Sequence, residues 1–335
     1  MQSELYDKII NWNFLVKTFD EQRFVELYQK SSISIEEYRK SLVNYDLVQF
    51  DRGLKFEKNK INSTQAGYQL IKKNKDKYTL ETQNKFIESE YIKLPLGSQG
   101  LQIFDNKYKI IWSYMNYDKF YFTDKRVMID YNYIIISSNE QQEMLYLFAL
   151  LNSKVNNFII DFYLKIPNEQ AILLGLTPIK QFIKIPLMDK NKEKIKNLIV
   201  KQMRHLFSIE EQKLSDLVDF RNITIQKFDS YSVDSDKLIL YKDSKTYNLK
   251  IQKTINYQYI KQSLDTYYND LKNITLFELK NINIIDKEQQ QNTKNYIDDL
   301  VYALYFNIEL DSNDINNANI VHEKCSSHEL YSICK

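Results

Sequence analysis

The sequence predicts an α+β fold, in which a β-rich domain with long helices follows a small helical domain. Short aromatic and β-branched segments, separated by polar turns, fill residues 91–137 as in antiparallel sheets. Long segments with apolar residues at i, i+3 and i+4 come after them. The 335 residues include only 5 Gly and 4 Pro, which argues against an all-β fold rich in tight turns.

The first 85 residues form the predicted helical domain. Their pattern alternates between helical spacing and a strand-like segment with Gly53 at its tip, which is compatible with a winged helix or with a plain helical cap. A Ser before an acidic first turn marks one of the helix starts. The elements expected here are helices at 1–30, 31–48 and 62–74 and a hairpin at 48–61.

Residues 86–310 form the predicted β-rich domain with its long helices. The expected strands are 91–97, 100–105, 108–115, 119–124, 126–130, 131–137, a strand-like segment at 172–189, short strands at 222–256, and 276–285. The expected helices are about 145–165, 189–220, 257–273 and 295–309. Residues 311–335 are polar, and we expect a flexible tail there.

The composition is that of a folded protein, with 43% hydrophobic and 27% charged residues. The amino terminus lacks the basic start and apolar core of a signal peptide, and the only two cysteines lie near the end. These features predict a cytoplasmic protein without a disulfide framework. The apolar segment 148–165 contains Lys, Asp and Asn residues, which excludes it as a membrane span.

The charge is nearly balanced overall, at +2, but is unevenly distributed. Residues 51–80 carry eight Lys/Arg against three acids, and residues 180–204 carry eight against two. Residues 281–335 carry four against nine. Local basic faces of this kind can bind a polyanion without a strongly basic chain.

Several catalytic classes are absent from the sequence. It has no Asn/Asp-Pro-Pro-aromatic loop of an amino-methyltransferase, and no Gly-rich, Walker, G-x-S-x-G or H-E-x-x-H motif. His205, on the helix at 189–220, is interpreted as an ordinary helix residue. We therefore expect no catalytic residue in this chain.

Two weaker hypotheses stay open. Asp270, Glu278 and Lys280 at strand spacing could hold a divalent metal in a nuclease. His322, Cys325, His328 and Cys334 supply two nitrogen and two sulfur ligands that would suit zinc, although their spacing matches no familiar zinc finger.

Aromatic and basic residues are interleaved in the segment 107–126. Such side chains can stack on bases and contact phosphates, while much of the segment must also form the buried face of a sheet. The turn residues are therefore the better DNA-contacting residues: Tyr117, Lys119, Lys125 and Arg126. We expect further phosphate contacts from Arg52, Lys55, Lys58, Lys60, Lys180 and Lys184.

Three motifs in this order resemble a known family. They are Leu150-Leu151-Asn152-Ser153-Lys154, then Ile185-Pro186, then the segment IDDLVYALYF at 297–306. The chain over about 100–310 resembles the target-recognition (specificity) domain of type IIG and type I-like restriction–modification adenine-N6 DNA methyltransferases. Phe306 and Leu187 depart from that family's pattern, at positions that are not catalytic.

The resemblance implies a role in DNA sequence recognition for a restriction–modification or phage-defence system. The β-rich part would read bases of double-stranded DNA, and the helix at 189–220 would dock a methyltransferase or restriction subunit. The catalytic domain that usually precedes this region is missing, so S-adenosylmethionine is expected on a partner. A specificity subunit, one part of a split enzyme and a stand-alone relative all fit. The alternatives are the metal-dependent nuclease and a non-catalytic scaffold.

Overall fold

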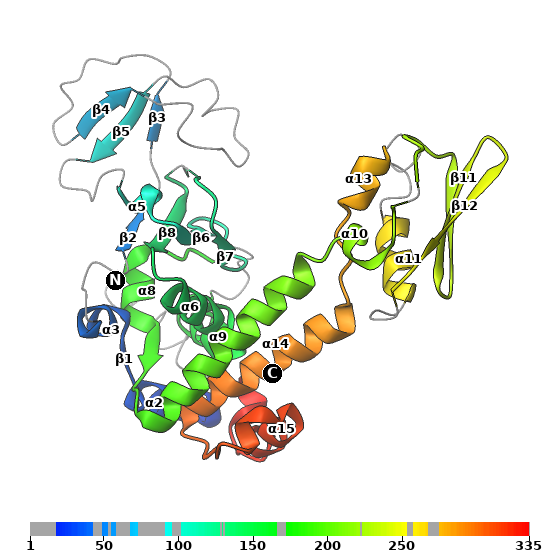
Figure 1. Cartoon of the computed structure of the whole chain (residues 1–335). Coiled ribbons are helices and arrows are strands. Elements are labelled where there is room, and N and C mark those ends of the chain that lie inside the picture. The colour runs from blue at the N-terminus through cyan, green and yellow to red at the C-terminus, as the bar shows by residue number, and fades with distance from the viewer. Residues whose placement is uncertain are drawn as a thin grey trace. The chain divides into compact units, whose positions relative to one another are not determined.

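The chain forms helices and antiparallel sheets, which confirms the predicted α+β class. The computed structural model describes residues 18–42, 49–52, 55–57, 68–72, 91–95, 102–127, 129, 131–165, 172–221, 223–252, 257–266 and 275–334. The chain divides into two compact units, residues 1–200 with 298–335, and residues 201–297 (Figure 1).

The first unit combines helices with short strands. Its helices are α2 (Phe19–Lys30), α3 (Ile35–Ser41), α5 (Gln102–Asp105), α6 (Gln141–Asn152), α7 (Lys154–Leu164), α8 (Leu176–Phe182), η2 (Asp314–Asn316), α15 (Ala318–Ser326) and η3 (Tyr331–Cys334). Its strands are β1 (Ser32–Ser34), β2 (Gln49–Arg52), β3 (Lys55–Glu57), β4 (Tyr68–Lys72), β5 (Tyr91–Pro95), β6 (Tyr108–Ser113), β7 (Tyr121–Thr123), β8 (Tyr133–Ser138) and β9 (Lys184–Pro186). Two long helices, α9 (Lys190–Glu210) and α14 (Lys287–Phe306), belong partly to each unit.

A four-stranded antiparallel sheet with the order β2-β8-β6-β7 is the main sheet of the first unit. One face packs on α6, where the ring of Phe122 lies 5.5 Å from that of Phe148. Trp112 is fully buried and donates its Nε1–H to the Leu174 carbonyl at 2.8 Å. Burial of such a large aromatic side chain contributes to the stability of the sheet. The sheet is the rigid support from which its turns project.

The segment 1–85, predicted as a separate domain, contributes strands to the first unit. Among its described residues, β1 pairs with β9 and β2 pairs with β8. The predicted hairpin at 48–61 is wrong, because β3 pairs with β5 and not with β2. Residues 68–72 form a strand where a helix was predicted. An alternating pattern predicts a strand but not its partner, which here is distant in sequence.

Local capping signals did predict helices in this part of the chain. Helix α3 begins at the expected serine, since Ser34 accepts from the Glu37 N–H and Glu37 accepts from the Ser34 N–H. Helix α2 confirms the second half of the predicted helix at 1–30, and residues 1–17 lie outside the described residues.

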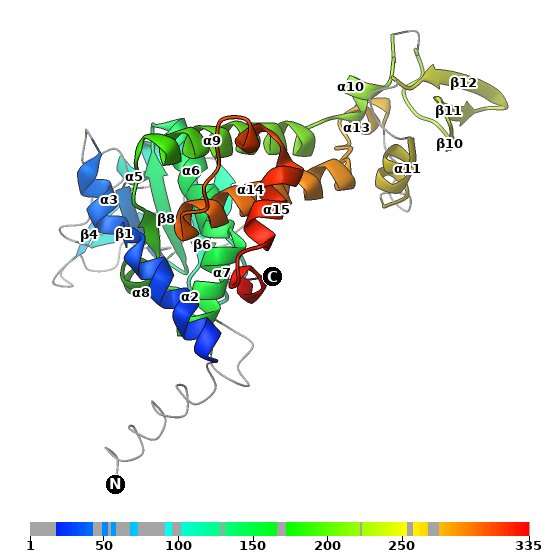
Figure 2. The ribbon, with the colours of Figure 1, turned by 90° about the horizontal axis from the view of Figure 1, so that it is seen from below.

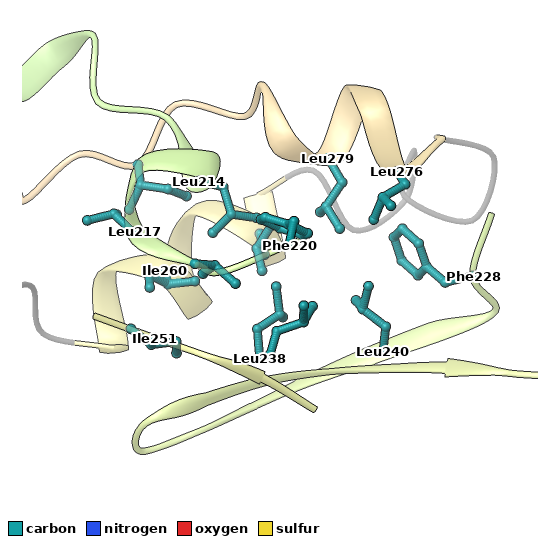
Figure 3. Packing of buried hydrophobic residues seen from close by; sticks show 14 residues of the cluster. Leu214, Leu217, Phe220, Phe228, Leu238, Leu240, Ile251, Ile260, Leu276 and Leu279 are labelled. Atoms are coloured by element: carbon teal, nitrogen blue, oxygen red, sulfur yellow. The ribbon is translucent and has the colours of Figure 1, made fainter. Parts of the chain in front are cut away.

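The second unit has its own hydrophobic core. A three-stranded antiparallel sheet, β10 (Ser230–Asp234), β11 (Lys237–Lys242) and β12 (Lys245–Lys250), packs with the helices α10 (Leu214–Leu217), α11 (Tyr257–Thr266) and α13 (Leu276–Lys280). Figure 3 shows Leu238 and Leu240 of the sheet facing Leu276 and Leu279 of α13. The strands predicted within 222–256 and the helix predicted at 257–273 are therefore confirmed in part.

Three other predicted strands are wrong or partly wrong. Residues 276–280 are helical because Thr275 and Glu278 form a capping box, a signal present in the sequence. Residues 102–105 form the short helix α5, and the strand-like segment 172–189 contains helix α8 before the short strand β9. In each case a short apolar run was compatible with both kinds of element.

The predicted flexible tail at 311–335 is also wrong. It forms η2, α15 and η3, and buries Val321, Cys325 and Tyr331. The Tyr331 hydroxyl donates to the buried Asp299 carboxylate of α14. The polar composition concealed a short apolar stripe at helical spacing, which docks this segment. Figure 2 shows α15 beside α14, and Cys325 of α15 donates to the Asp299 carbonyl of α14.

A buried polar network joins five elements of the first unit, α2, α6, α7, β9 and α14. The Asn156 side chain is inaccessible to solvent; its Oδ1 accepts from the Tyr28 hydroxyl at 2.7 Å, and its Nδ2 donates to the Leu150 carbonyl at 2.7 Å and the Tyr305 hydroxyl at 3.1 Å. The two tyrosines also hold the backbone of Lys184: its N–H donates to Tyr28 at 2.7 Å and its carbonyl accepts from Tyr305 at 2.6 Å. The network fixes α2, α6, α7, α14 and β9 to one another.

We predict that Asn156→Ala strongly destabilises the protein. The substitution removes the amide that binds the Tyr28 hydroxyl, the Tyr305 hydroxyl and the Leu150 carbonyl, and these buried polar groups lose a hydrogen-bond partner. The free energy of unfolding should therefore fall by about 3 kcal/mol. Urea-induced unfolding followed by tyrosine and tryptophan fluorescence measures the change. The matched control is Asn319→Ala on the exposed side of α15, for which about 0.5 kcal/mol or less is expected. Equal losses for the two variants would contradict the role given to the network.

Candidate nucleic-acid interface

The turns on either side of β7 expose basic and aromatic side chains. Lys119, Lys125 and Arg126 are all exposed, and Tyr121 and Met115 are 46% and 48% exposed. In contrast, Phe120 between them is buried against Trp112, with ring centroids 5.1 Å apart. The segment therefore divides as predicted, into a buried face and a set of exposed turn residues.

Polar residues that interrupt the apolar segment 148–165, chiefly Asn152, hold the turn before β7. The Phe120 N–H donates to Asn152 Oδ1 at 3.1 Å, and Asn152 Nδ2 donates to the Phe120 carbonyl at 3.3 Å. Asn157 Nδ2 donates to the Asn152 carbonyl at 3.3 Å. Ser153 ends α6 and caps α7 through the Asn156 N–H, so the chain turns at this point. Asn152 and its neighbours therefore anchor the exposed turn to the helices α6 and α7.

Lys119 and Tyr121 form a small cationic and aromatic pair at the surface. Lys119 Nζ lies 5.0 Å from the centroid of the Tyr121 ring, a cation–π distance. The Tyr121 hydroxyl donates to Asp118 Oδ2 at 2.7 Å, and this hydrogen bond raises the pKa of Tyr121 to about 12. The tyrosine thus stays a neutral stacking group near neutral pH. Side chains of this kind can stack on a base and contact a phosphate.

The other predicted DNA contacts have different environments. Tyr117 is half-buried, donates weakly to Asn157 Oδ1 at 3.4 Å and packs on Phe120, and burial raises its pKa. Lys180 pairs with Glu36 at 2.5 Å, a contact that a phosphate would have to replace. Lys184 is partly buried, with its backbone in the Asn156 network. These three residues have structural roles, and their contact with DNA stays a prediction.

Of the four basic residues expected to contact phosphates from the segment 48–61, two lie on described strands. Arg52 lies at the end of β2 and Lys55 at the start of β3. Lys58 and Lys60 lie outside the described residues, as do the side-chain surroundings of Arg52 and Lys55. Their contact with phosphates stays a prediction.

The three family-like motifs meet in the first unit although they are far apart in the sequence. Lys154 of the first motif contacts Asp298 of the third: its N–H donates to Oδ1 at 3.1 Å and its Nζ lies 3.9 Å from Oδ2. Tyr305 of the third motif binds the carbonyl of Lys184, directly before Ile185-Pro186. These motif residues are thus packing and anchoring residues.

The residues of the zinc hypothesis are engaged in other contacts. His322 Nδ1 lies 2.9 Å from Asp299 Oδ2, and His328 Nδ1 lies 2.7 Å from the Tyr302 hydroxyl. Burial raises the pKa of the Cys325 thiol, and it raises the pKa of Cys334 to about 12. Zinc requires thiolates. Over residues 18–334, as far as the structure describes them, no group of three or more His, Cys, Asp or Glu side chains could hold a metal ion.

The nuclease hypothesis gains no support from Glu278 and Lys280. The Glu278 carboxylate accepts from the Thr275 N–H at 2.6 Å and from its hydroxyl at 3.0 Å, which lowers the pKa of Glu278. Lys280 Nζ lies 5.3 Å from the centroid of the Phe220 ring. The two residues lie on a helix and not on the strand that the hypothesis requires. Asp270 lies outside the described residues.

A polar groove of about 790 Å³ lies at the start of α9 and the end of α14 within the first unit. Its charged side chains largely bind one another and the local backbone. Lys324 pairs with Asp314 at 2.6 Å, Lys194 Nζ donates to Ser312 at 3.3 Å, and Asp189 accepts from the N–H groups of Asn191 and Lys192. This mixed-charge lining indicates no particular class of ligand.

Comparisons with known proteins give a distant structural likeness only. No protein-family model matches the chain, and no curated protein sequence matches it. One solved structure that is similar is the S subunit of a type I restriction–modification system from M. genitalium, with 10% identity, a TM-score of 0.25, and coverage of 88% of this chain and 98% of that chain. A likeness at this level establishes neither fold nor function for the present chain. Within the described parts of the chain, no helix is long and apolar enough to cross a membrane.

We predict that Asp298→Asn stabilises the protein at neutral pH. Burial raises the pKa of Asp298 to about 6, so its ionised form is disfavoured in the folded state. The folded protein therefore binds more protons than the unfolded chain between about pH 4 and pH 6, and stability falls as the pH rises through this window. Asparagine removes the charge and retains an acceptor for the Lys154 N–H.

The gain in the free energy of unfolding should be about 2 kcal/mol at pH 7.5 and should vanish near pH 4. Urea unfolding at the two pH values measures it. Asp161→Asn, in an exposed ion pair with Lys165, is the control and should change stability by about 0.5 kcal/mol or less. A loss of stability for Asp298→Asn at pH 7.5 would show that the ion pair with Lys154 outweighs the cost of burial.

Proposed function

We propose that this chain recognises a DNA sequence as the specificity component of a restriction–modification or phage-defence system. The observation that carries the proposal is the surface formed by Lys119, Tyr121, Lys125 and Arg126, in which exposed cationic and aromatic groups project from a buried sheet. Hereafter we call these four residues the basic turn surface. Turns with a fixed backbone and such side chains are suited to hydrogen bonding with base edges and to contacts with phosphates.

The placement of the family-like motifs supports the finer form of the proposal. Lys154 of the first motif contacts Asp298 of the third, and Tyr305 of the third binds Lys184 directly before the second, as a structural signature of one domain type would. The likeness of the motifs to specificity domains of adenine-N6 methyltransferases then gives the partner: a methyltransferase or restriction subunit that supplies S-adenosylmethionine and catalysis. Arg52, Lys55, Lys58, Lys60, Lys180 and Lys184 would add phosphate contacts.

The long helices are the proposed partner-docking elements. Within the second unit, Gln290 Nε2 donates to Glu210 Oε1 at 2.6 Å and Lys294 Nζ lies 3.3 Å from the same oxygen, so the end of α9 and the start of α14 are bound together. A paired helix surface is stiffer than a single helix and can present side chains from both helices to a partner groove.

We predict that replacing Lys119, Lys125 and Arg126 together by Ala weakens DNA binding and reduces its salt dependence. Each lost phosphate contact should reduce the slope of log affinity against log salt by about 0.9, so the slope should fall by up to about 3. Fluorescence anisotropy with a labelled random-sequence duplex, over a range of salt concentrations, gives both quantities.

The control variant also loses three positive charges, but at positions outside the basic turn surface. Lys30, Lys40 and Lys165 are exposed on α2, on α3 and after α7, and their triple Ala variant should retain the wild-type slope. If the two triple variants lower the affinity equally, net charge and not the basic turn surface governs binding. If the wild-type chain binds no duplex DNA at low salt, the proposed function is wrong.

A further inference from the structure

Lys109 is a lysine buried in the main sheet of the first unit. It lies on β6 with 1% of its surface exposed, and no carboxylate of the described residues forms an ion pair with it. A buried ammonium is costly unless each of its N–H groups has an acceptor. Here the acceptors are three backbone carbonyls, those of Asn106, Lys107 at 3.4 Å and Lys125 at 3.1 Å.

The three carbonyls belong to two different turns. Asn106 and Lys107 precede β6, and Lys125 follows β7. The first turn is independently fixed, since Asn106 Nδ2 donates to Ser137 Oγ at 3.0 Å and the Lys107 N–H donates to Asn139 Oδ1 at 2.9 Å. One ammonium group therefore ties the turn after β7 to a turn that is already fixed to β8.

The peptide units around Lys125 are held on both sides. Its N–H donates to Thr123 Oγ1 at 3.1 Å, and Thr123 pairs with Lys109 in the β6–β7 ladder. Its carbonyl accepts from Lys109 Nζ. The exposed side chains of Lys125 and Arg126 thus leave from a fixed backbone, which lowers the conformational entropy lost when they bind a ligand.

We propose that Lys109 is a positioning residue, which holds the turn Thr123–Arg126 so that Lys125 and Arg126 meet neighbouring phosphates of DNA. The inference rests on the proposed function and deepens it. Lys109 does not touch DNA; it acts through the backbone of the turn. The ammonium form supplies three donors for the three carbonyls, and a neutral amine supplies only two.

The charge state of Lys109 gives the inference a second readout. Burial lowers the pKa of Lys109 to about 8, and the nearby Arg126 also lowers it, while the carboxylates of Asp105 and Asp124 raise it. Because the folded-state pKa lies below the ordinary value of lysine, the proton is lost as the pH rises through about 8. The hold on the turn should then weaken at a pH where exposed lysines stay charged.

The test compares the full-length wild type with Lys109→Met and Lys109→Arg. Limited trypsin digestion with mass spectrometry measures cleavage after Lys125 and Arg126, and DNA binding to a random-sequence duplex is measured against salt and pH. In Lys109→Met, cleavage at these two sites should be roughly tenfold faster, because cleavage follows the population of the opened turn. The salt slope should fall by up to about 2.

Two further variants separate the role of Lys109 in the turn from a general loss of folding. Lys109→Arg keeps a permanent charge, so it should retain the wild-type slope, and its affinity should not show the fall that wild type shows between about pH 7 and pH 9. Thr123→Val removes the other anchor of the same turn without touching a buried charge. It should give faster cleavage at Lys125 and Arg126 even if Lys109→Met fails to fold.

The outcomes separate the two claims. Wild-type DNA binding together with an unchanged slope and unchanged cleavage in the Lys109→Met chain, or in the Thr123→Val chain if the former does not fold, overturns the inference alone. Absence of any duplex binding by the wild type overturns the proposed function and the inference that depends on it. Faster cleavage, a smaller slope and loss of the pH effect in Lys109→Arg support both.

Discussion

The first unit depends on the buried side chain of Asn156. Its amide binds Tyr28, Tyr305 and the Leu150 carbonyl, and the two tyrosines fix the backbone of Lys184, so α2, α7, β9 and α14 have one relative arrangement. An apolar contact would tolerate small shifts of these helices, whereas a buried polar network is favourable only when every group is paired. The network thus makes the packing of the helices specific as well as stable.

Hydrogen bonds connect the packed helices and the sheet to the exposed turns. Asn152 stands one turn before Asn156 and binds both polar backbone groups of Phe120, and Lys109 binds the backbone beyond β7. The backbone of the basic turn surface is therefore held by hydrogen bonds on both sides of β7. In the proposed DNA recognition this arrangement would be favourable: phosphate contacts would provide affinity, and a fixed backbone would keep base-reading groups in register.

The sequence predicted the features that depend on neighbouring residues. The α+β class, the helix start at a serine before an acidic first turn and the division of the segment 107–126 into buried and exposed residues all follow from local patterns. The pairing of β2 with β8 and of β3 with β5 did not, because it joins segments about 35 to 90 residues apart, and alternation carries no information about the partner. Lys109 was missed for a related reason: a lysine in an alternating strand is expected on the solvent face, and its three carbonyl acceptors come from turns that the sequence does not place.

The most direct test of DNA sequence recognition is selection from a pool of random-sequence duplexes by the full-length chain, alone and with a candidate methyltransferase subunit, at near-physiological salt. If the turns of the β6–β7 sheet read bases, the bound duplexes should share one short sequence after several rounds. A bound pool with the composition of the starting pool would contradict sequence recognition, and would leave only salt-dependent attraction to the phosphate backbone.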